Sequence, residues 1–230
     1  MNTKDLERII KSDSLQDNDD YVLIVKDPHD GSCTEEELKA FKATCKLFGL
    51  ETAEIEYKGK EDLQLQFAEA NLWPAKFIYL SAHGTRQGFG FDHERMYFWP
   101  WYELAQAICL GECLRDHGVL LMGCCRGGLM GISADMFHHC PHIDYICGPR
   151  WTVDYADLIV GFSVFLYNFD HRNEQPTVAA SRASNATNYD FYAYDRVEFE
   201  DAQWCKNMGL RAPEISYVVD EETLEISEEE

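Results

Sequence analysis

Residues 119–128, Val-Leu-Leu-Met-Gly-Cys-Cys-Arg-Gly-Gly, decide the fold of this chain together with residues 78–84, Ile-Tyr-Leu-Ser-Ala-His-Gly. Each stretch is a short apolar run that ends in small residues and one reactive side chain. Apolar runs of this length, bounded by glycine, are typical of buried strands. If the two strands are parallel neighbours, His83 and Cys125 lie side by side at one edge of the sheet. A thiol beside an imidazole is the arrangement of a cysteine nucleophile and its base.

Strand and helix patterns alternate on both sides of these stretches through the first 170 residues. This alternation favours parallel pairing with helices on both faces of the sheet. The sequence therefore predicts a three-layer α/β/α fold with a mostly parallel central sheet of about six strands. Strands are expected at 21–25, 52–57, 77–81, 119–122 and 144–147, with weaker candidates at 189–197 and 215–219. Helices are expected from a capping box at 34–37 to Gly49, and at 62–72, 101–114, 155–168 and 176–187.

Two further segments have no place in that alternation. Residues 88–91 and 96–98 suggest a hairpin, and a loop of about twenty residues is expected between Cys125 and the strand at 144–147. We expect an N-terminal extension over 1–20, one domain over 21–219 and an acidic tail over 220–230. From Glu214 to the end of the sequence there are eight acidic residues and no Lys or Arg, which indicates a solvated segment.

The net charge of −21 restricts the possible partners. A surface this negative repels phosphates, so we expect no nucleic-acid partner, and it favours basic peptides or proteins. The longest apolar run, residues 158–166, is too short to span a bilayer, and the first residues lack the apolar core of a secretory signal. Nine cysteines without such a signal indicate free thiols in a reducing, cytoplasmic compartment.

No cofactor is expected from the sequence. The glycines at 127, 128 and 131 are not followed by the Gly-Lys-Ser/Thr of a phosphate loop, and the first strand leads into Asp-Pro-His-Asp-Gly at 27–31 rather than a dinucleotide fingerprint. The cluster His-His-Cys-Pro-His at 138–142 does not have the ligand spacing of structural zinc sites, so no metal is expected there either.

Cys124-Cys125-Arg126-Gly127-Gly128, following an apolar strand, resembles the caspase pattern, in which the nucleophilic Cys precedes Arg-Gly and the His lies about fifty residues upstream. Here His83 and Cys125 are 42 residues apart. The Ser-Ala-His-Gly turn at 81–84, the hairpin and the helix before the Cys strand occur in the same order in caspase-like peptidases. The segment Gly-Pro-Arg-Trp-Thr-Val-Asp at 148–154 is more similar to CHAT domains and separase. The likeness extends over roughly residues 20–195.

The resemblance implies a cysteine endopeptidase. Cys125 stands where the caspase nucleophile stands, while Cys124 takes the preceding position and is expected to face the core. His83 is expected to act as the base. Gly84 matters because a backbone N–H must approach the oxyanion without an intervening Cβ, and with the Cys125 N–H it would form the oxyanion hole. Each residue also has a structural alternative, a buried inert thiol for Cys125 and a hydrogen-bonded core histidine for His83.

Substrate preference is implied less directly. The position two residues before the Cys is Gly123, so the aspartate specificity of caspases does not carry over. In separase and protease-type CHAT relatives an acid in the Trp-x-Val-x-Asp region pairs with a substrate Arg, and Asp154 is the nearest match. Asp154 could equally cap the helix that follows it. Trp151 and Asp157 could line the same pocket, or serve as a core residue and a cap.

The expected partners are a protein or peptide substrate and a regulatory partner or small-molecule activator, because the chain leaves little room for a sensory domain. Peptidases of the CHAT kind often serve microbial defence or cell-death pathways, which is an analogy of family only. The alternative function is a catalytically silent caspase-like scaffold that binds a protein partner through the same cleft.

Overall fold

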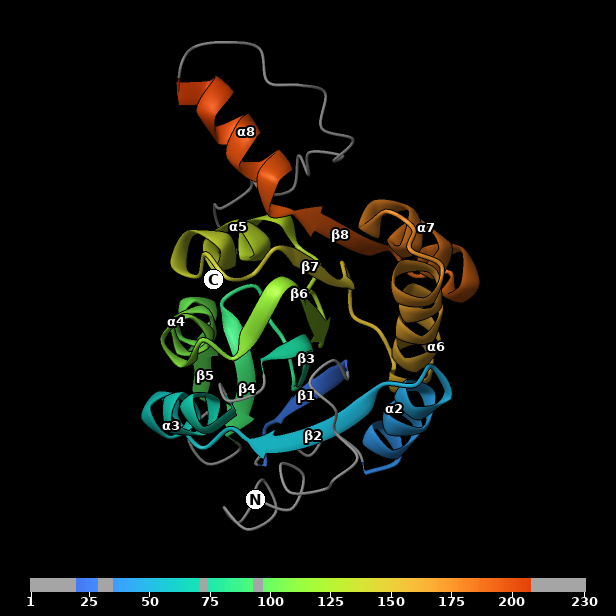
Figure 1. Ribbon diagram of the computed structural model, residues 1–230, viewed down its shortest axis with the longest axis horizontal. Coiled ribbons are helices and arrows are strands. Elements are labelled where there is room, and N and C mark those ends of the chain that lie inside the picture. The colour runs from blue at the N-terminus through green and yellow to red at the C-terminus, as the bar shows by residue number, and fades with distance from the viewer. Residues whose placement is uncertain (1–19, 29–34, 71–73, 93–96, 208–230) are drawn as a thin grey trace, which may run out of the picture.

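A six-stranded sheet runs through the middle of the molecule (Figure 1). The computed structural model describes residues 20–28, 35–70, 74–92 and 97–207. In spatial order the strands are β2 (Glu51–Glu56), β1 (Tyr21–Lys26), β3 (Ala75–Ser81), β6 (Leu114–Gly123), β7 (Tyr145–Pro149) and β8 (Phe191–Asp195). The first five are parallel and β8 is antiparallel to β7. The predicted hairpin is present as the antiparallel pair β4 (Gly88–Asp92) and β5 (Tyr97–Pro100).

Helices cover both faces of the sheet, which confirms the predicted fold class (Figure 1). Alternate residues of each strand point to opposite faces, so Ile78 and Leu80 join one core cluster while Phe77 and Tyr79 join the other. The first cluster is covered by α3 (Lys60–Ala70), α4 (Trp101–Gly111) and α5 (Met130–His139). The second is covered by α2 (Glu35–Leu47), α6 (Tyr155–Leu166) and α7 (Pro176–Thr187).

The structure corrects the sequence analysis in three places. The expected twenty-residue loop after Cys125 is wrong, because residues 130–139 form α5, which buries Ile132, Met136 and Phe137. The region after the last strand contains an unexpected helix, α8 (Arg196–Asn207), and α6 continues into a π-helix, η1 (Tyr167–His171). The weaker strand candidate at 189–197 is confirmed as β8. The extension at 1–20, Thr34 of the capping box, the candidate at 215–219 and the acidic tail lie outside the described residues.

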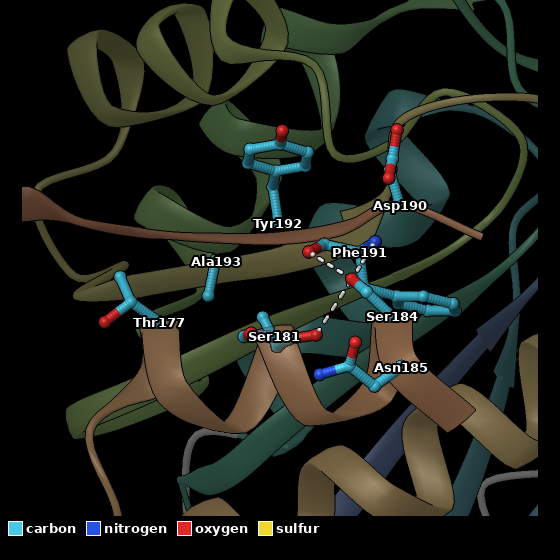
Figure 2. A pocket seen from close by; sticks show the side chains of 9 residues that line it. Thr177, Ser181, Ser184, Asn185, Asp190, Phe191, Tyr192 and Ala193 are labelled. Atoms are coloured by element: carbon cyan, nitrogen blue, oxygen red, sulfur yellow. Dashed lines mark hydrogen bonds between the residues drawn. The ribbon is translucent and has the colours of Figure 1, made fainter. Parts of the chain in front are cut away.

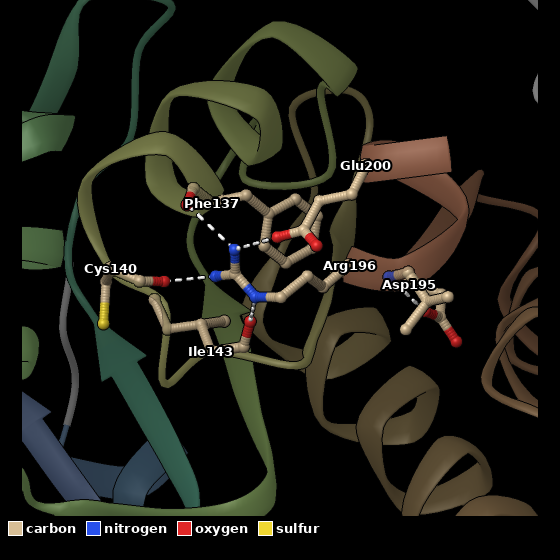
Figure 3. Close-up of polar contacts among 7 residues, drawn as sticks. Phe137, Cys140, Ile143, Asp195, Arg196 and Glu200 are labelled. Carbon is tan, nitrogen blue, oxygen red and sulfur yellow. Dashed lines mark hydrogen bonds and ion pairs between the residues drawn. The ribbon is translucent and has the colours of Figure 1, made fainter. Parts of the chain in front are cut away.

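Arg196 ties the end of α5 to the start of α8 (Figure 3). Its guanidinium donates to the carbonyl oxygens of Ile143 at 2.7 Å and Phe137 at 3.0 Å, and to that of Cys140. It also pairs with Glu200 at 3.1 Å. The planar guanidinium can satisfy several acceptors at once, so this one buried side chain serves the carbonyl groups at the C-terminal end of α5. It thereby fixes the helix that follows the Cys125 loop.

Candidate active site

Strand register places His83 and Cys125 at the same level. β3 and β6 are parallel neighbours, and their last paired residues are Ser81 and Gly123. His83 and Cys125 each follow two residues later, beyond the carboxyl ends of the strands. β7 continues the same level on the other side of β6, since Leu121 pairs with Cys147. The segment after Pro149 therefore leaves the sheet beside the Cys125 turn.

Gly84 lies directly against the main chain of the cysteine pair. A Cβ added at Gly84 would be 2.2 Å from the carbonyl oxygen of Cys125 and 3.1 Å from the Sγ of Cys124. Real Cβ atoms do not approach a backbone oxygen this closely, so only glycine fits. The His-Gly turn and the Cys-Cys turn, far apart in sequence, are thus in contact through their backbones.

The two cysteines have different surroundings. Cys124 is only 2% exposed and belongs to the core cluster beneath α4 and α5. Cys125 is half-buried, and its thiol lies against the Val153 carbonyl of a segment that packs on the second core cluster. The chain reverses here because the Cys124 N–H donates to the Met122 carbonyl at 2.8 Å and Arg126 adopts a left-handed φ of 64°. The expectation that Cys124 faces the core is confirmed, and Cys125 is the more accessible thiol of the pair.

The Cys125 thiol donates to the carbonyl oxygen of Val153, with an S···O distance of 3.7 Å. Two more hydrogen bonds join the same segments. The Arg126 N–H donates to the Trp151 carbonyl at 3.2 Å, and the Gly128 N–H to that of Pro149 at 2.8 Å. The loop after Cys125 therefore rests on the chain that leaves β7, and the thiol proton is held by a main-chain acceptor.

Two backbone N–H groups lie at the paired turns, those of Gly84 and Cys125. Gly84 forms an isolated antiparallel β-bridge with Phe89. Two hydrogen bonds flank this pair: the Thr85 N–H donates to the Gly88 carbonyl, and the Gly90 N–H donates to the His83 carbonyl, both at 2.8 Å. This pattern makes Gly84 and Phe89 a non-hydrogen-bonded pair, whose N–H groups point away from each other. Within the described ranges, no acceptor is bonded to the N–H of Gly84 or of Cys125.

Asp154 caps α6. Its carboxylate accepts from the N–H groups of Ala156 at 2.9 Å and Asp157 at 3.0 Å, so the capping alternative is confirmed. The carboxylate is also exposed, one residue beyond the Val153 acceptor. Asp157 lies next to it, and partial desolvation together with the negative charge of Asp154 raises the pKa of Asp157 above its usual value. Two acidic groups therefore stand close together near the Cys125 thiol.

Trp151 is 39% exposed, so it is not the core residue of the structural alternative. Its indole N–H donates to Asp190 at 3.0 Å, and the guanidinium of Arg150 stacks 5.0 Å from its ring centre. Arg150 also lies over the ring of Tyr192, at 5.6 Å. The Trp151 ring is therefore held at the surface beside the Cys125 loop by residues on and before β8.

Glu37 is a buried acid that the sequence analysis assigned only to a helix cap. Its side chain is on the second core face, only 4% of the residue is exposed, and it accepts from the hydroxyls of Tyr79 at 2.8 Å and Ser81 at 3.1 Å. The Tyr79 ring in turn lies against Gly123, where an added Cβ would be 2.4 Å from Cζ. A carboxylate is thus placed on the Cys125 side of the sheet. The sequence did not indicate that Glu37 is buried, because acidic residues are common in the first turn of a helix.

Most other described thiols are poor nucleophiles. Burial raises the pKa of both Cys45 and Cys140 to about 12. It raises the pKa of Cys113 and Cys147 as well. A buried thiol stays protonated because the apolar surroundings disfavour the thiolate. Cys109 is half-buried like Cys125 but lies within α4, so Cys125 is distinguished by its position just beyond a strand end together with partial access to solvent.

The sequence matches no protein-family model and no curated protein. Among the described helices, none has the length and apolar character needed to cross a membrane. The described His, Cys, Asp and Glu side chains include no group of three or more placed to hold a metal ion.

Proposed function

We propose that the chain is a cysteine endopeptidase of the caspase-like, CHAT-type kind, with Cys125 as nucleophile and His83 as base. The observation that carries the proposal is the direct contact between the Gly84 backbone and the Cys125 carbonyl group at the ends of two neighbouring parallel strands. This contact leaves an imidazole-bearing turn and a half-exposed thiol at one edge of the sheet. Two unbonded amide N–H groups accompany them.

The reaction follows from these groups. The Cys125 sulfur attacks the scissile carbonyl carbon while its proton passes to His83, and the substrate oxygen becomes an oxyanion held by the N–H groups of Gly84 and Cys125. His83 then protonates the leaving amine as the C–N bond breaks, which leaves a thioester. Water, deprotonated by His83, hydrolyses the thioester and restores the thiol. The bond from Cys125 to Val153 must open before the first step.

A substrate with Arg or Lys before the scissile bond fits the acidic groups near Cys125. Asp154 directly follows Val153, the acceptor of the thiol, and Asp157 lies one turn into α6. Trp151 offers an exposed ring, and Glu37 is a buried carboxylate on the second core face. A carboxylate holds a guanidinium through paired hydrogen bonds. The net charge of −21 also favours the approach of a basic segment.

The setting of the activity is part of the same proposal. A cytoplasmic location agrees with the free thiols of the described cysteines. Activation by a regulatory protein or a small molecule agrees with a resting thiol whose proton is bonded to Val153. A role in microbial defence or cell death is inferred from the family resemblance alone.

A peptide carrying an electrophilic chloromethyl ketone tests the chemistry. We expect labelling of Cys125 by probes with Arg or Lys next to the warhead, no labelling in Cys125→Ala, and slow labelling in His83→Ala. Cys124→Ala is the matched control and should label normally, because that thiol faces the core. Labelling that persists in Cys125→Ala would exclude Cys125 as the nucleophile.

Substrate preference is tested with peptide pools carrying Arg, Lys or Asp before the cleaved bond. Asp154→Asn keeps the α6 cap, since Asn is as good an N-cap as Asp, and removes only the charge. A higher KM for Arg and Lys substrates with unchanged thermal stability supports a substrate role for Asp154. Glu37→Gln, which keeps the acceptor for Tyr79 and Ser81, separates the contribution of the buried acid. Cleavage after Asp alone would exclude the basic preference.

The second candidate is a catalytically silent scaffold that binds a protein partner through the same site. The bond between the Cys125 thiol and the Val153 carbonyl favours it, because it engages the proton that catalysis must remove. The two candidates are separated by the chloromethyl ketone probe on a folded chain supplied with its partner. Absence of any Cys125 adduct under those conditions supports the scaffold.

A further inference from the structure

A cavity of about 330 Å³ lies between α7 and the edge strand β8 (Figure 2), and one of its lining residues, Asp190, also accepts the Trp151 indole N–H at 3.0 Å. Thr177, Ser181 and Asn185 of α7 form one wall, and Ala193 of β8 is on the other. Figure 2 shows these α7 side chains directed toward the strand. The cavity therefore combines hydroxyl and amide groups with the backbone of a sheet edge.

The hydrogen bonds of β8 determine which of its backbone groups face that cavity. The backbone N–H of Arg150 donates to the backbone carbonyl of Asp190 at 2.8 Å, and the backbone N–H of Arg196 donates to the backbone carbonyl of Asp144 at 2.9 Å. In an antiparallel pair, bonded and non-bonded residues alternate. Ala193 is an odd number of residues from both bonded positions, so its N–H and C=O point away from β7, to the free edge.

The neighbouring outward position is already occupied. Ser184 accepts from the N–H of Phe191 at 2.8 Å and donates to its carbonyl at 3.1 Å (Figure 2). One hydroxyl thus takes the place of a partner strand at Phe191. Ala193 has no such partner among the described residues, although only 3% of it is exposed. A buried backbone donor and acceptor without partners cost free energy, which a ligand with the complementary groups would recover.

We propose that this cavity binds one extended segment of a partner protein, which adds to β8 as a strand, pairs with Ala193 and places a basic side chain near Asp190. Strand addition supplies both groups that Ala193 requires. The basic side chain follows from charge, since Asp190 is an exposed carboxylate on the cavity wall, no Lys or Arg lines the cavity, and the chain carries a net charge of −21. This docking does not depend on the chemistry of Cys125.

The test uses a phage-displayed library of random peptides about ten residues long, enough for one strand, selected against the full chain carrying Cys125→Ala. Enriched peptides are synthesised and their affinities measured by fluorescence anisotropy. Ser181→Arg fills the cavity from an exposed helix position. Val178→Arg adds the same charge on an exposed residue of the same helix outside the cavity lining, and serves as the matched control.

We expect Lys- or Arg-containing peptides whose affinity falls about tenfold or more in Ser181→Arg and is unchanged in Val178→Arg. Amide exchange of Ala193, followed by NMR, should slow when the peptide binds. Failure to enrich any peptide, or equal binding to both arginine variants, would overturn the proposal. Concentration-dependent self-association of the chain that Ser181→Arg abolishes would also overturn it, because the occupant would then be a second copy. Because the selection uses Cys125→Ala, none of these outcomes depends on peptidase activity.

Discussion

The backbone at Gly84 passes so close to the carbonyl group of Cys125 that no side chain fits between them. This single contact joins two residues that lie 41 positions apart in sequence. It also orients the Gly84 N–H, because the two hydrogen bonds beside Gly84 fix its peptide plane. At the scale of the residue, the site therefore depends more on main-chain geometry than on side-chain contacts.

Gly84→Ala tests this dependence. A Cβ at this position must displace the Cys125 carbonyl or the His-Gly turn, so we expect kcat/KM to fall by about 10²–10³-fold, the effect of losing an oxyanion donor. Gly131→Ala is the control, because a Cβ added there meets nothing within 4 Å. Peptide hydrolysis by the two variants, with circular dichroism to verify folding, makes the comparison. Wild-type kcat/KM in Gly84→Ala would contradict the proposed oxyanion hole.

At the scale of the element, the start of α6 combines a structural and a chemical role. Asp154 supplies the N-cap of the helix, and its negative charge contributes to the raised pKa of Asp157 one turn further along the same helix. The helix thus carries two acids close together at the end nearest the Cys125 thiol. Such a pair is unfavourable at neutral pH unless a cation binds.

The raised pKa of Asp157 predicts a pH-dependent effect on stability. A carboxyl whose pKa is higher in the folded state favours folding at low pH, and this contribution is lost as the pH rises through the folded-state pKa. Asp157→Asn should therefore raise the melting temperature relative to wild type near neutral pH. The difference should disappear below about pH 3, where the Asp157 carboxyl is protonated in both the folded and the unfolded state. Scanning calorimetry across this range measures it, and a difference that grows toward low pH would contradict the assignment.

Arg196 gives a second prediction at this scale. Arg196→Met removes the donor to three carbonyl oxygens at and after the end of α5 and should lower the free energy of unfolding by about 3 kcal/mol. Arg196→Lys keeps the charge but cannot reach all three acceptors, so an intermediate loss is expected. Arg182→Met, which removes an exposed pair with Glu174, is the control and should cost under about 1 kcal/mol. Urea denaturation compares the three; equal losses would show that burial does not matter here.

The sequence was sufficient for the elements that follow simple patterns. The strands ending at Ser81 and Gly123 are continuous apolar runs, and their parallel pairing followed from the alternation of strands and helices. It was insufficient for α5, whose apolar residues Ile132, Met136 and Phe137 lie between a glycine-rich turn and Pro141, features that also mark loops. The contacts of Glu37 and the bond from Cys125 to Val153 depend on tertiary packing, which no local pattern encodes.

At the scale of the whole molecule, the net negative charge is the main factor that destabilises the folded state. A net charge of −21 on 230 residues repels itself in the compact state. The described ion pairs, such as Lys76 with Asp20, offset only part of it. The same negative charge attracts basic partners to both candidate binding sites, the Cys125 turn and the edge of β8.

Salt should therefore stabilise the protein. Raising NaCl from about 10 to 150 mM shortens the screening length from about 30 to 8 Å, and we expect the melting temperature to rise by several degrees. A chain ending at Val219 lacks seven of the acids and should show a smaller rise. Differential scanning fluorimetry compares the two chains. A melting temperature that falls with salt in both would show that attractive ion pairs outweigh the repulsion.

The acceptor of the Cys125 thiol lies 28 residues further along the chain. During synthesis on the ribosome, Cys125 and His83 emerge before Val153, Asp154 and the strand that supports them. A chain that ends before Val153 consequently lacks both the carbonyl group that accepts the Cys125 thiol proton and the helix end that carries Asp154 and Asp157. The order of translation itself thus delays assembly of the complete site until α6, which follows β7, has left the ribosome and packed on the sheet.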